Sequence, residues 1–99
     1  MNRIQGRTVL VTGATAGIGE ACSRRFAAEG ARVVMLGRRS DRLDQLAEEL
    51  RRDHGTEVRT AAVDVRDRAA IEALRDALAA DGFVPDVVLN NAGKARGLD

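Results

Sequence analysis

The sequence predicts an α/β fold, a doubly wound parallel sheet in the order β-α-β-α-β-α-β with its strands side by side as 3-2-1-4. Four short apolar runs alternate along the chain with segments whose apolar residues recur at helical spacing. The second run, residues 32–36, continues without a polar break after its arginine, which is typical of a parallel strand buried on both faces. The 99 residues form one small domain, residues 1–99.

The first strand is expected at residues 7–12 and the first helix at residues 17–29, with Gly30 as the carboxy-terminal cap. The expected inner face of this helix has apolar residues four apart, namely Ile18, Cys22 and Phe26. Glu20 and Arg24 form an i, i+4 pair on its polar side.

The second strand leads into a helix that Ser40 is expected to cap and that ends near residues 53–55. The apolar stripe of this helix has i, i+3, i+4 and i+7 spacing: Leu43, Leu46, Ala47 and Leu50. Residues 57–63 predict a third strand whose weaker apolar pattern suits a sheet edge.

Asp67 is the candidate cap of the third helix, which ends near residues 81–82 and is followed by a fourth strand at residues 86–89. The apolar residues of this helix are Ile71, Leu74 and Leu78. In the 3-2-1-4 arrangement the strand order reverses between strands one and four, and ligands bind at such a switch point. The turns after these two strands, residues 13–19 and 90–93, are therefore expected on one crevice.

Composition excludes several classes of function. The formal charge of +1 argues against nucleic-acid or membrane partners, and two Phe with no Tyr or Trp leave no stacking platform for single strands. No apolar run approaches the roughly 20 residues of a membrane span, and the amino terminus lacks the apolar core of a signal peptide. A single cysteine, Cys22, fits a reducing compartment, so a cytoplasmic location is expected. No metal-ligand spacing is present.

A glycine-rich turn links the first strand to the first helix. It contains Gly13, Ala14, Thr15, Ala16, Gly17, Ile18 and Gly19. Glycines at a strand-to-helix turn allow close backbone approach, and the helix amino terminus offers N–H groups to a phosphate. The G-x-x-x-G-x-G spacing differs from both the G-x-G-x-x-G fingerprint and the Walker A loop. The alternative is an ordinary turn that holds three glycines.

The run Thr12-Gly13-x-x-x-Gly17-Ile18-Gly19, together with Asn90-Asn91-Ala92-Gly93, resembles the classical branch of the short-chain dehydrogenase/reductase family. The resemblance covers nearly the whole chain and implies a Rossmann fold that binds NAD(H) or NADP(H). It implies that residues 13–19 hold the pyrophosphate and that Asn90, Asn91, Ala92 and Gly93 lie near the nicotinamide-side ribose. It also implies that Asp64 and Val65 flank the adenine, the alternative being a plain strand end.

The end of the second strand indicates which cofactor is preferred. Proteins that bind the free ribose hydroxyls of NAD have an acidic residue about 20 residues beyond the glycines, whereas an arginine accommodates the 2′-phosphate of NADP. Gly37 stands at the acidic position, and Arg38 and Arg39 follow. The prediction is NADP(H) rather than NAD(H), although both arginines could instead be solvated surface charges. The sequence of these stretches is similar to that of the NADP-dependent 3-hydroxy acid (serine) dehydrogenases.

The family's catalytic Tyr, and the Lys four residues after it, cannot be assigned here, because the chain has no Tyr and its single lysine is Lys94. We therefore expect the amino-terminal part of a longer oxidoreductase that moves hydride between NADP(H) and an alcohol or carbonyl. The longer enzyme is expected to be a homo-oligomer, and the 99-residue chain is expected to be inactive and to self-associate through its fourth strand. Two alternatives stay open: a non-catalytic nucleotide-binding or sensor module, and a structural half-domain.

Overall fold

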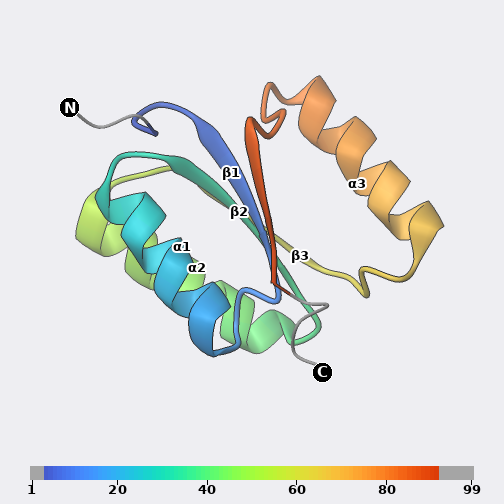
Figure 1. The fold of residues 1–99 in the computed structure, drawn as a ribbon, viewed down its shortest axis with the longest axis horizontal. Coiled ribbons are helices and arrows are strands. Elements are labelled where there is room, and N and C mark those ends of the chain that lie inside the picture. Colours follow the sequence, from blue (N-terminus) through green and yellow to red (C-terminus); the bar gives the residue numbers. More distant parts are fainter. Residues whose placement is uncertain (1–3, 92–99) are drawn as a thin grey trace.

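A computed structural model describes residues 4–91 as a four-stranded sheet flanked by three helices (Figure 1). The elements in chain order are β1 (Thr8–Thr12), α1 (Gly17–Ala28), β2 (Arg32–Gly37), α2 (Ser40–His54), β3 (Val58–Ala62), α3 (Arg68–Ala80) and β4 (Val87–Asn90). All neighbouring strands are parallel, and the order β3-β2-β1-β4 confirms the predicted topology. Helices α1 and α2 cover one face of the sheet, and α3 lies on the other (Figure 1).

The main core lies between the sheet and the two helices α1 and α2. Alternate strand residues such as Val9, Val33 and Met35 face this side and are fully buried. The predicted apolar stripe of α2 packs into this core, where all four of its residues are buried: Leu43, Leu46, Ala47 and Leu50. This packing fixes α1 and α2 against the sheet and so sets where their amino termini lie.

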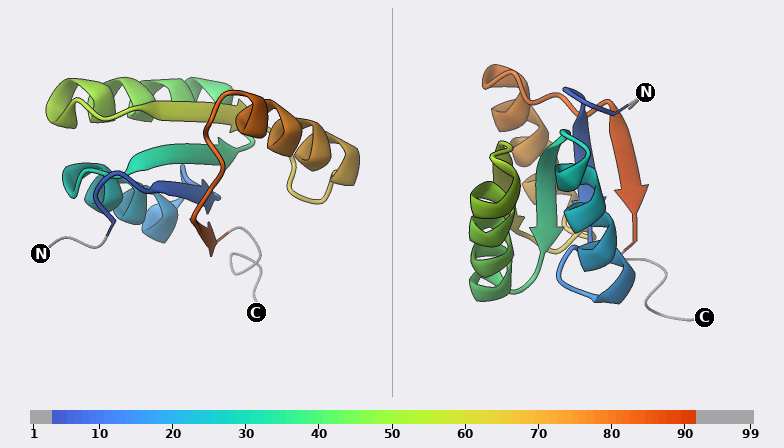
Figure 2. Two further views of the ribbon diagram at one scale, coloured as in Figure 1. Left: turned by 90° about the horizontal axis from the view of Figure 1, so that it is seen from above. Right: turned by 90° about the vertical axis from the view of Figure 1, so that its left-hand side faces the viewer.

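The opposite face is covered less completely. Of the α3 residues only Leu78 is buried, packed with Val34, Leu36 and Phe83. An apolar groove of about 510 Å³ lies beside it, bordered by residues of α3, β1 and β4. The side chain of Val88 in β4 is 62% exposed there. Strand β4 forms one outer edge of the sheet (Figure 2), while β3 forms the other edge, as predicted.

Helix ends agree with the predictions to within a residue. The Asp67 carboxylate accepts a hydrogen bond from the Ala70 N–H at 3.1 Å, which confirms this cap. One expected cap is wrong by one position, because Arg39, not Ser40, is the N-cap of α2, without a capping side-chain bond. Gly30 ends α1 as expected: it follows the C-cap residue Glu29 with φ of +88°, and the N–H groups of Gly30 and Ala31 donate to the carbonyls of Ala27 and Phe26.

The buried face of α1 differs from the prediction. Its buried residues are Gly19, Ser23 and Ala27, whereas Ile18 is 70% exposed. Gly19 lies inside because α1 starts too close to the turn after β1 for a side chain at this position. The Ser23 hydroxyl donates to the Gly19 carbonyl at 2.9 Å, so its burial leaves no polar atom unpaired. Within residues 4–91, no helix is long and apolar enough to cross a membrane.

Candidate functional site

The two sequence motifs meet at the carboxyl ends of β1 and β4. Thr12 is paired with Asn90 in the parallel register, so the residues after both strands share one corner of the sheet. The Thr12 hydroxyl accepts a hydrogen bond from the Asn91 N–H at 2.8 Å and lies 3.1 Å from the Asn90 Oδ1. The Asn91 side-chain amide donates to the Gly13 carbonyl at 3.2 Å. Asn91 therefore fixes the glycine turn from the side of β4.

Gly19 approaches this turn so closely that no side chain fits. A Cβ on Gly19 would stand 2.1 Å from the Gly13 carbonyl oxygen and 2.9 Å from the Asn91 Nδ2. Gly13 itself has φ of +63°, a conformation that residues with a Cβ rarely adopt. These two glycines thus have distinct roles: Gly13 makes the turn, and Gly19 allows α1 to start against it.

The amino terminus of α1 opens toward solvent. A Cβ on Gly17 would meet no atom within 4 Å, and Ala16 and Ile18 are exposed as well. Within residues 4–91, the backbone N–H groups of Gly17 and Ile18 have no hydrogen-bond acceptor. Donors at a helix amino terminus, together with its positive partial charge, suit a phosphate. The other turn residues anchor the loop, because Ala14 is fully buried and Thr15 is half-buried.

The end of β2 places two cations beside this turn. Gly37 is buried, and a Cβ there would lie 3.4 Å from Leu43 Cδ2 and 3.6 Å from Thr15 Oγ1. Arg38 and Arg39 follow with exposed side chains. No carboxylate in the described part of the chain lies within ion-pair distance of either guanidinium. Both guanidinium groups are therefore exposed and without an ion-pair partner in this part of the chain.

Asp64 and Val65 follow β3 at the same edge of the sheet. The Arg66 N–H donates to the Asp64 carboxylate at 2.9 Å, and the Arg66 guanidinium pairs with it at 2.9 Å. These contacts, aided by the charge of Arg38, hold the pKa of Asp64 well below its usual range. Val65 is 37% exposed and borders the apolar groove. An ionised acceptor thus stands beside an apolar side chain.

The structure places the described members of the predicted site at the carboxyl ends of the four neighbouring strands. Asn90 is exposed and Asn91 half-buried at the end of β4. Ala92 and Gly93, which were also predicted, lie outside the described residues. Among residues 4–91 no group of His, Cys, Asp or Glu side chains could hold a metal ion.

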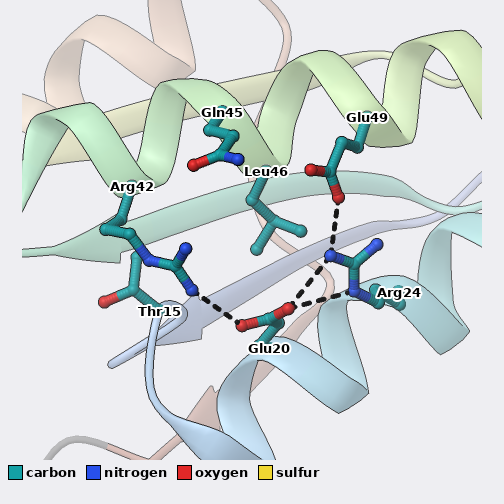
Figure 3. A pocket seen from close by; sticks show the side chains of 7 residues that line it. All are labelled: Thr15, Glu20, Arg24, Arg42, Gln45, Leu46 and Glu49. Carbon is teal, nitrogen blue, oxygen red and sulfur yellow. Dashed lines mark hydrogen bonds and ion pairs between the residues drawn. The ribbon is translucent and has the colours of Figure 1, made fainter.

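Sequence reasoning missed a charged cluster between α1 and α2 (Figure 3). Glu20 pairs with Arg24 at 3.0 Å, as its spacing predicted, but also with Arg42 of α2 at 3.4 Å. Arg24 in turn pairs with Glu49 at 2.6 Å. The cluster surrounds a cavity of about 20 Å³ that Thr15 of the glycine turn also lines (Figure 3). No sequence spacing gives the contacts between the two helices, which depend on how the helices cross.

Known proteins share both the sequence and the fold. A 3-hydroxy acid dehydrogenase of Salmonella typhi, named as NADP-dependent, is 52% identical over 91 residues, covering 92% of this chain and 35% of its own length. Serine 3-dehydrogenase of Agrobacterium fabrum is 46% identical, covering 91% and 34% of the two chains. The crystal structure of L-sorbose reductase from Gluconobacter frateurii, complexed with NADPH and L-sorbose, superimposes with a TM-score of 0.86 at 32% identity. That match covers all of this chain and 40% of the reductase.

This chain spans about a third of the length of the curated relatives that it matches. The short chain dehydrogenase family matches residues 7–98, nearly the whole sequence. The glycine turn, the strand order and the position of the Asn90-Asn91 pair agree with that match. The chain therefore belongs to the short-chain dehydrogenase family.

Proposed function

We propose that this chain is the NADP(H)-binding portion of an oxidoreductase that transfers hydride between NADP(H) and an alcohol or carbonyl carbon. One observation carries the proposal. Arg38 and Arg39 stand without a carboxylate partner within residues 4–91, beside a glycine turn, at a strand end where Gly37 replaces an acid. The names of the NADP-dependent relative and of the NADPH complex support the same cofactor.

The pyrophosphate is assigned to the glycine turn, residues 13–19. Gly17 and Ile18 supply N–H groups that have no acceptor in the described chain, and the absent Cβ of Gly17 leaves room for a ligand. The closeness of Gly19 to Gly13 keeps these donors at the strand end. Backbone donors at a helix start bind phosphate without a cationic side chain.

The 2′-phosphate is assigned to Arg38 and Arg39. A guanidinium keeps its charge at all physiological pH values and matches phosphate oxygens with two parallel donors. Two cations at the start of α2 oppose the helix dipole, so they cost free energy until an anion binds. A carboxylate at position 37 would repel that anion, and glycine there removes the conflict.

The remaining assignments follow the order of the strands. Asp64, ionised, and Val65, apolar and partly exposed, border the adenine, whose exocyclic amine is a hydrogen-bond donor. Asn90, Asn91, Ala92 and Gly93 are assigned to the nicotinamide side. The amide of Asn91 is already committed to Gly13, so it braces the turn rather than the ligand.

Bound NADP(H) supplies the hydride acceptor or donor. The residues of this chain bind and orient it, and none of them is assigned to proton transfer, because a Tyr followed by a Lys four residues later is absent from the sequence. The 99-residue chain should therefore show no turnover of any alcohol or ketone with NADP(H). We propose 3-hydroxy acids as the substrate class of the whole enzyme, from the names of two relatives, and the cytoplasm as its location.

Calorimetric titration of the chain with NADP⁺ and NAD⁺ tests the proposal. We expect NADP⁺ to bind more tightly, with a difference that shrinks as salt screens the phosphate contact. Equal affinity for the two dinucleotides would instead favour a general nucleotide-binding or sensor module. Binding of neither by a folded chain would favour a structural half-domain.

A further inference from the structure

Arg42 lies in the first turn of α2, directly after the two arginines already assigned. It follows Arg39, the extended N-cap of α2, by three residues, and the side chains at these two positions approach each other at a helix start. Arg42 is the third residue of α2, and its side chain is 42% exposed. A ligand bound at Arg38 and Arg39 would therefore lie within reach of the long Arg42 side chain.

The Arg42 side chain points toward the glycine turn, not away from it. In Figure 3 it extends from α2 toward Glu20, with Thr15 beside it. The Thr15 Oγ1 is also 3.6 Å from the position at which a Cβ on Gly37 would stand. Thr15 thus lies near both Gly37, at the end of β2, and Arg42, in the first turn of α2.

Arg42 holds its partner, Glu20, only weakly. One Glu20 oxygen, Oε1, lies 3.4 Å from the Arg42 Nη2. The other, Oε2, accepts hydrogen bonds from both the Nε and the Nη2 of Arg24, at 3.2 and 3.0 Å. Contacts with Glu49 and Glu20 raise the pKa of Arg24, so this guanidinium remains charged and keeps Glu20 paired. Arg42 can leave without exposing an uncompensated carboxylate.

We propose that Arg42 is a third selectivity residue, whose guanidinium exchanges Glu20 for the 2′-phosphate of NADP(H) when the cofactor binds. The inference rests on the proposed function. A phosphate dianion offers three strong acceptors and more charge than a half-exposed carboxylate that another arginine already neutralises. Glu20 then acts as a competitor that holds Arg42 in the unliganded chain.

The competing explanation is a structural clamp, in which the pair of Arg42 and Glu20 merely ties α2 to α1. The two explanations predict opposite changes in NADP⁺ affinity when Glu20 is removed. If the pair is a clamp, removing either partner weakens binding of both dinucleotides. If Glu20 competes with the phosphate, removing Arg42 weakens NADP⁺ alone, whereas removing Glu20 strengthens it.

Calorimetric titrations of two variants with NADP⁺ and NAD⁺ at one low salt concentration distinguish them. Arg42→Gln should weaken NADP⁺ about ten-fold, as expected for a lost charge-assisted bond, and leave NAD⁺ within about two-fold. Glu20→Gln should strengthen NADP⁺ by about two- to five-fold, the range for an exposed ion pair. Arg52→Gln removes the same charge from the far end of α2 and should change neither dissociation constant.

The double variant Glu20→Gln/Arg42→Gln separates release of Arg42 from simple removal of a negative charge. If Glu20 acts through Arg42, the gain from Glu20→Gln disappears in the Arg42→Gln background, and persistence of that gain would overturn the proposal. A loss of both cofactors in both single variants would overturn it in favour of the clamp. If Arg38→Ala lowers NADP⁺ affinity selectively and Arg42→Gln does not, the inference fails while the proposed function stands. A wild-type chain that does not prefer NADP⁺ would instead contradict the proposed function itself.

Discussion

The carbonyl oxygen of Gly13 lies 2.1 Å from the point at which a Cβ on Gly19 would stand. A backbone carbonyl cannot move aside as the end of a flexible side chain can. Gly19→Ala should therefore displace the start of α1 and cost about 1–3 kcal/mol of folding free energy, as overpacking does. Displacement of the N–H groups of Gly17 and Ile18 should also abolish NADP⁺ binding in calorimetric titration.

Gly82→Ala is the matched control for Gly19→Ala. Gly82 has φ of +77°, so an alanine there is strained, yet its Cβ would meet no atom within 4 Å. It lies beyond α3, away from the glycine turn. It should lower stability to urea while keeping NADP⁺ affinity at temperatures where the chain is folded. Full NADP⁺ affinity in Gly19→Ala would remove the turn from the site.

The Thr12 hydroxyl joins the two motifs, since it accepts the Asn91 N–H and lies beside Asn90. Thr12→Val keeps the shape of the side chain but leaves the Asn91 N–H without this acceptor. The cost should be about 1–3 kcal/mol in the free energy of unfolding, measured with urea. Thr60→Val is the control, because that hydroxyl makes an exposed contact of 3.5 Å to Asp44. Equal stability of the two variants would show that Thr12 does not hold the motifs together.

Much of this fold follows from periodicity alone. The unbroken run of β2 and the stripe of α2 are dictated by burial, and the structure confirms both. Helix α1 is harder to predict, because spacing placed Ile18 on its inner face, whereas Ile18 is 70% exposed and Gly19 is buried against the turn after β1. The conformation of the glycine turn was predictable because its motif is local. The pair of Glu20 and Arg42, 22 residues apart, depends on helix crossing and has no signal in the sequence.

Cofactor binding should depend on pH only when the 2′-phosphate is present. The lowered pKa of Asp64 means that its carboxylate is ionised throughout pH 5–8. Its contribution to folding is present above the unfolded-state pKa of about 3.9 and is lost only as the pH falls below that value. The arginines stay charged, whereas a phosphate monoester gains its second charge near pH 6.

NADP⁺ affinity should accordingly rise severalfold between pH 5 and pH 8 at constant ionic strength, and NAD⁺ affinity should stay constant. His54, the single histidine of the sequence, ends α2 far from Arg38, and His54→Gln should not alter either profile. The same pH profile for both dinucleotides would mean that a protein group is titrating instead.

Strand β4 presents an apolar edge, with Val88 62% exposed and β1 as its one paired neighbour among the described strands. An exposed apolar edge strand favours pairing with a second copy. Sedimentation velocity should therefore show concentration-dependent association of the chain, and Val88→Lys should reduce it. Val84→Lys changes a valine of similar exposure that lies outside the strand, and should have the smaller effect. A wild-type chain that stays monomeric at high concentration would contradict the prediction.

The central claim is that the end of β2 recognises a 2′-phosphate, and Arg38→Ala tests it most directly. The measured quantity is the ratio of the NADP⁺ and NAD⁺ dissociation constants, with Arg52→Ala as a control at the far end of α2. Loss of a charge-assisted bond of about 1.5–3 kcal/mol should weaken NADP⁺ by about one to two decades, leaving NAD⁺ unchanged. An unchanged ratio, whether both cofactors weaken equally or neither changes, would contradict the account.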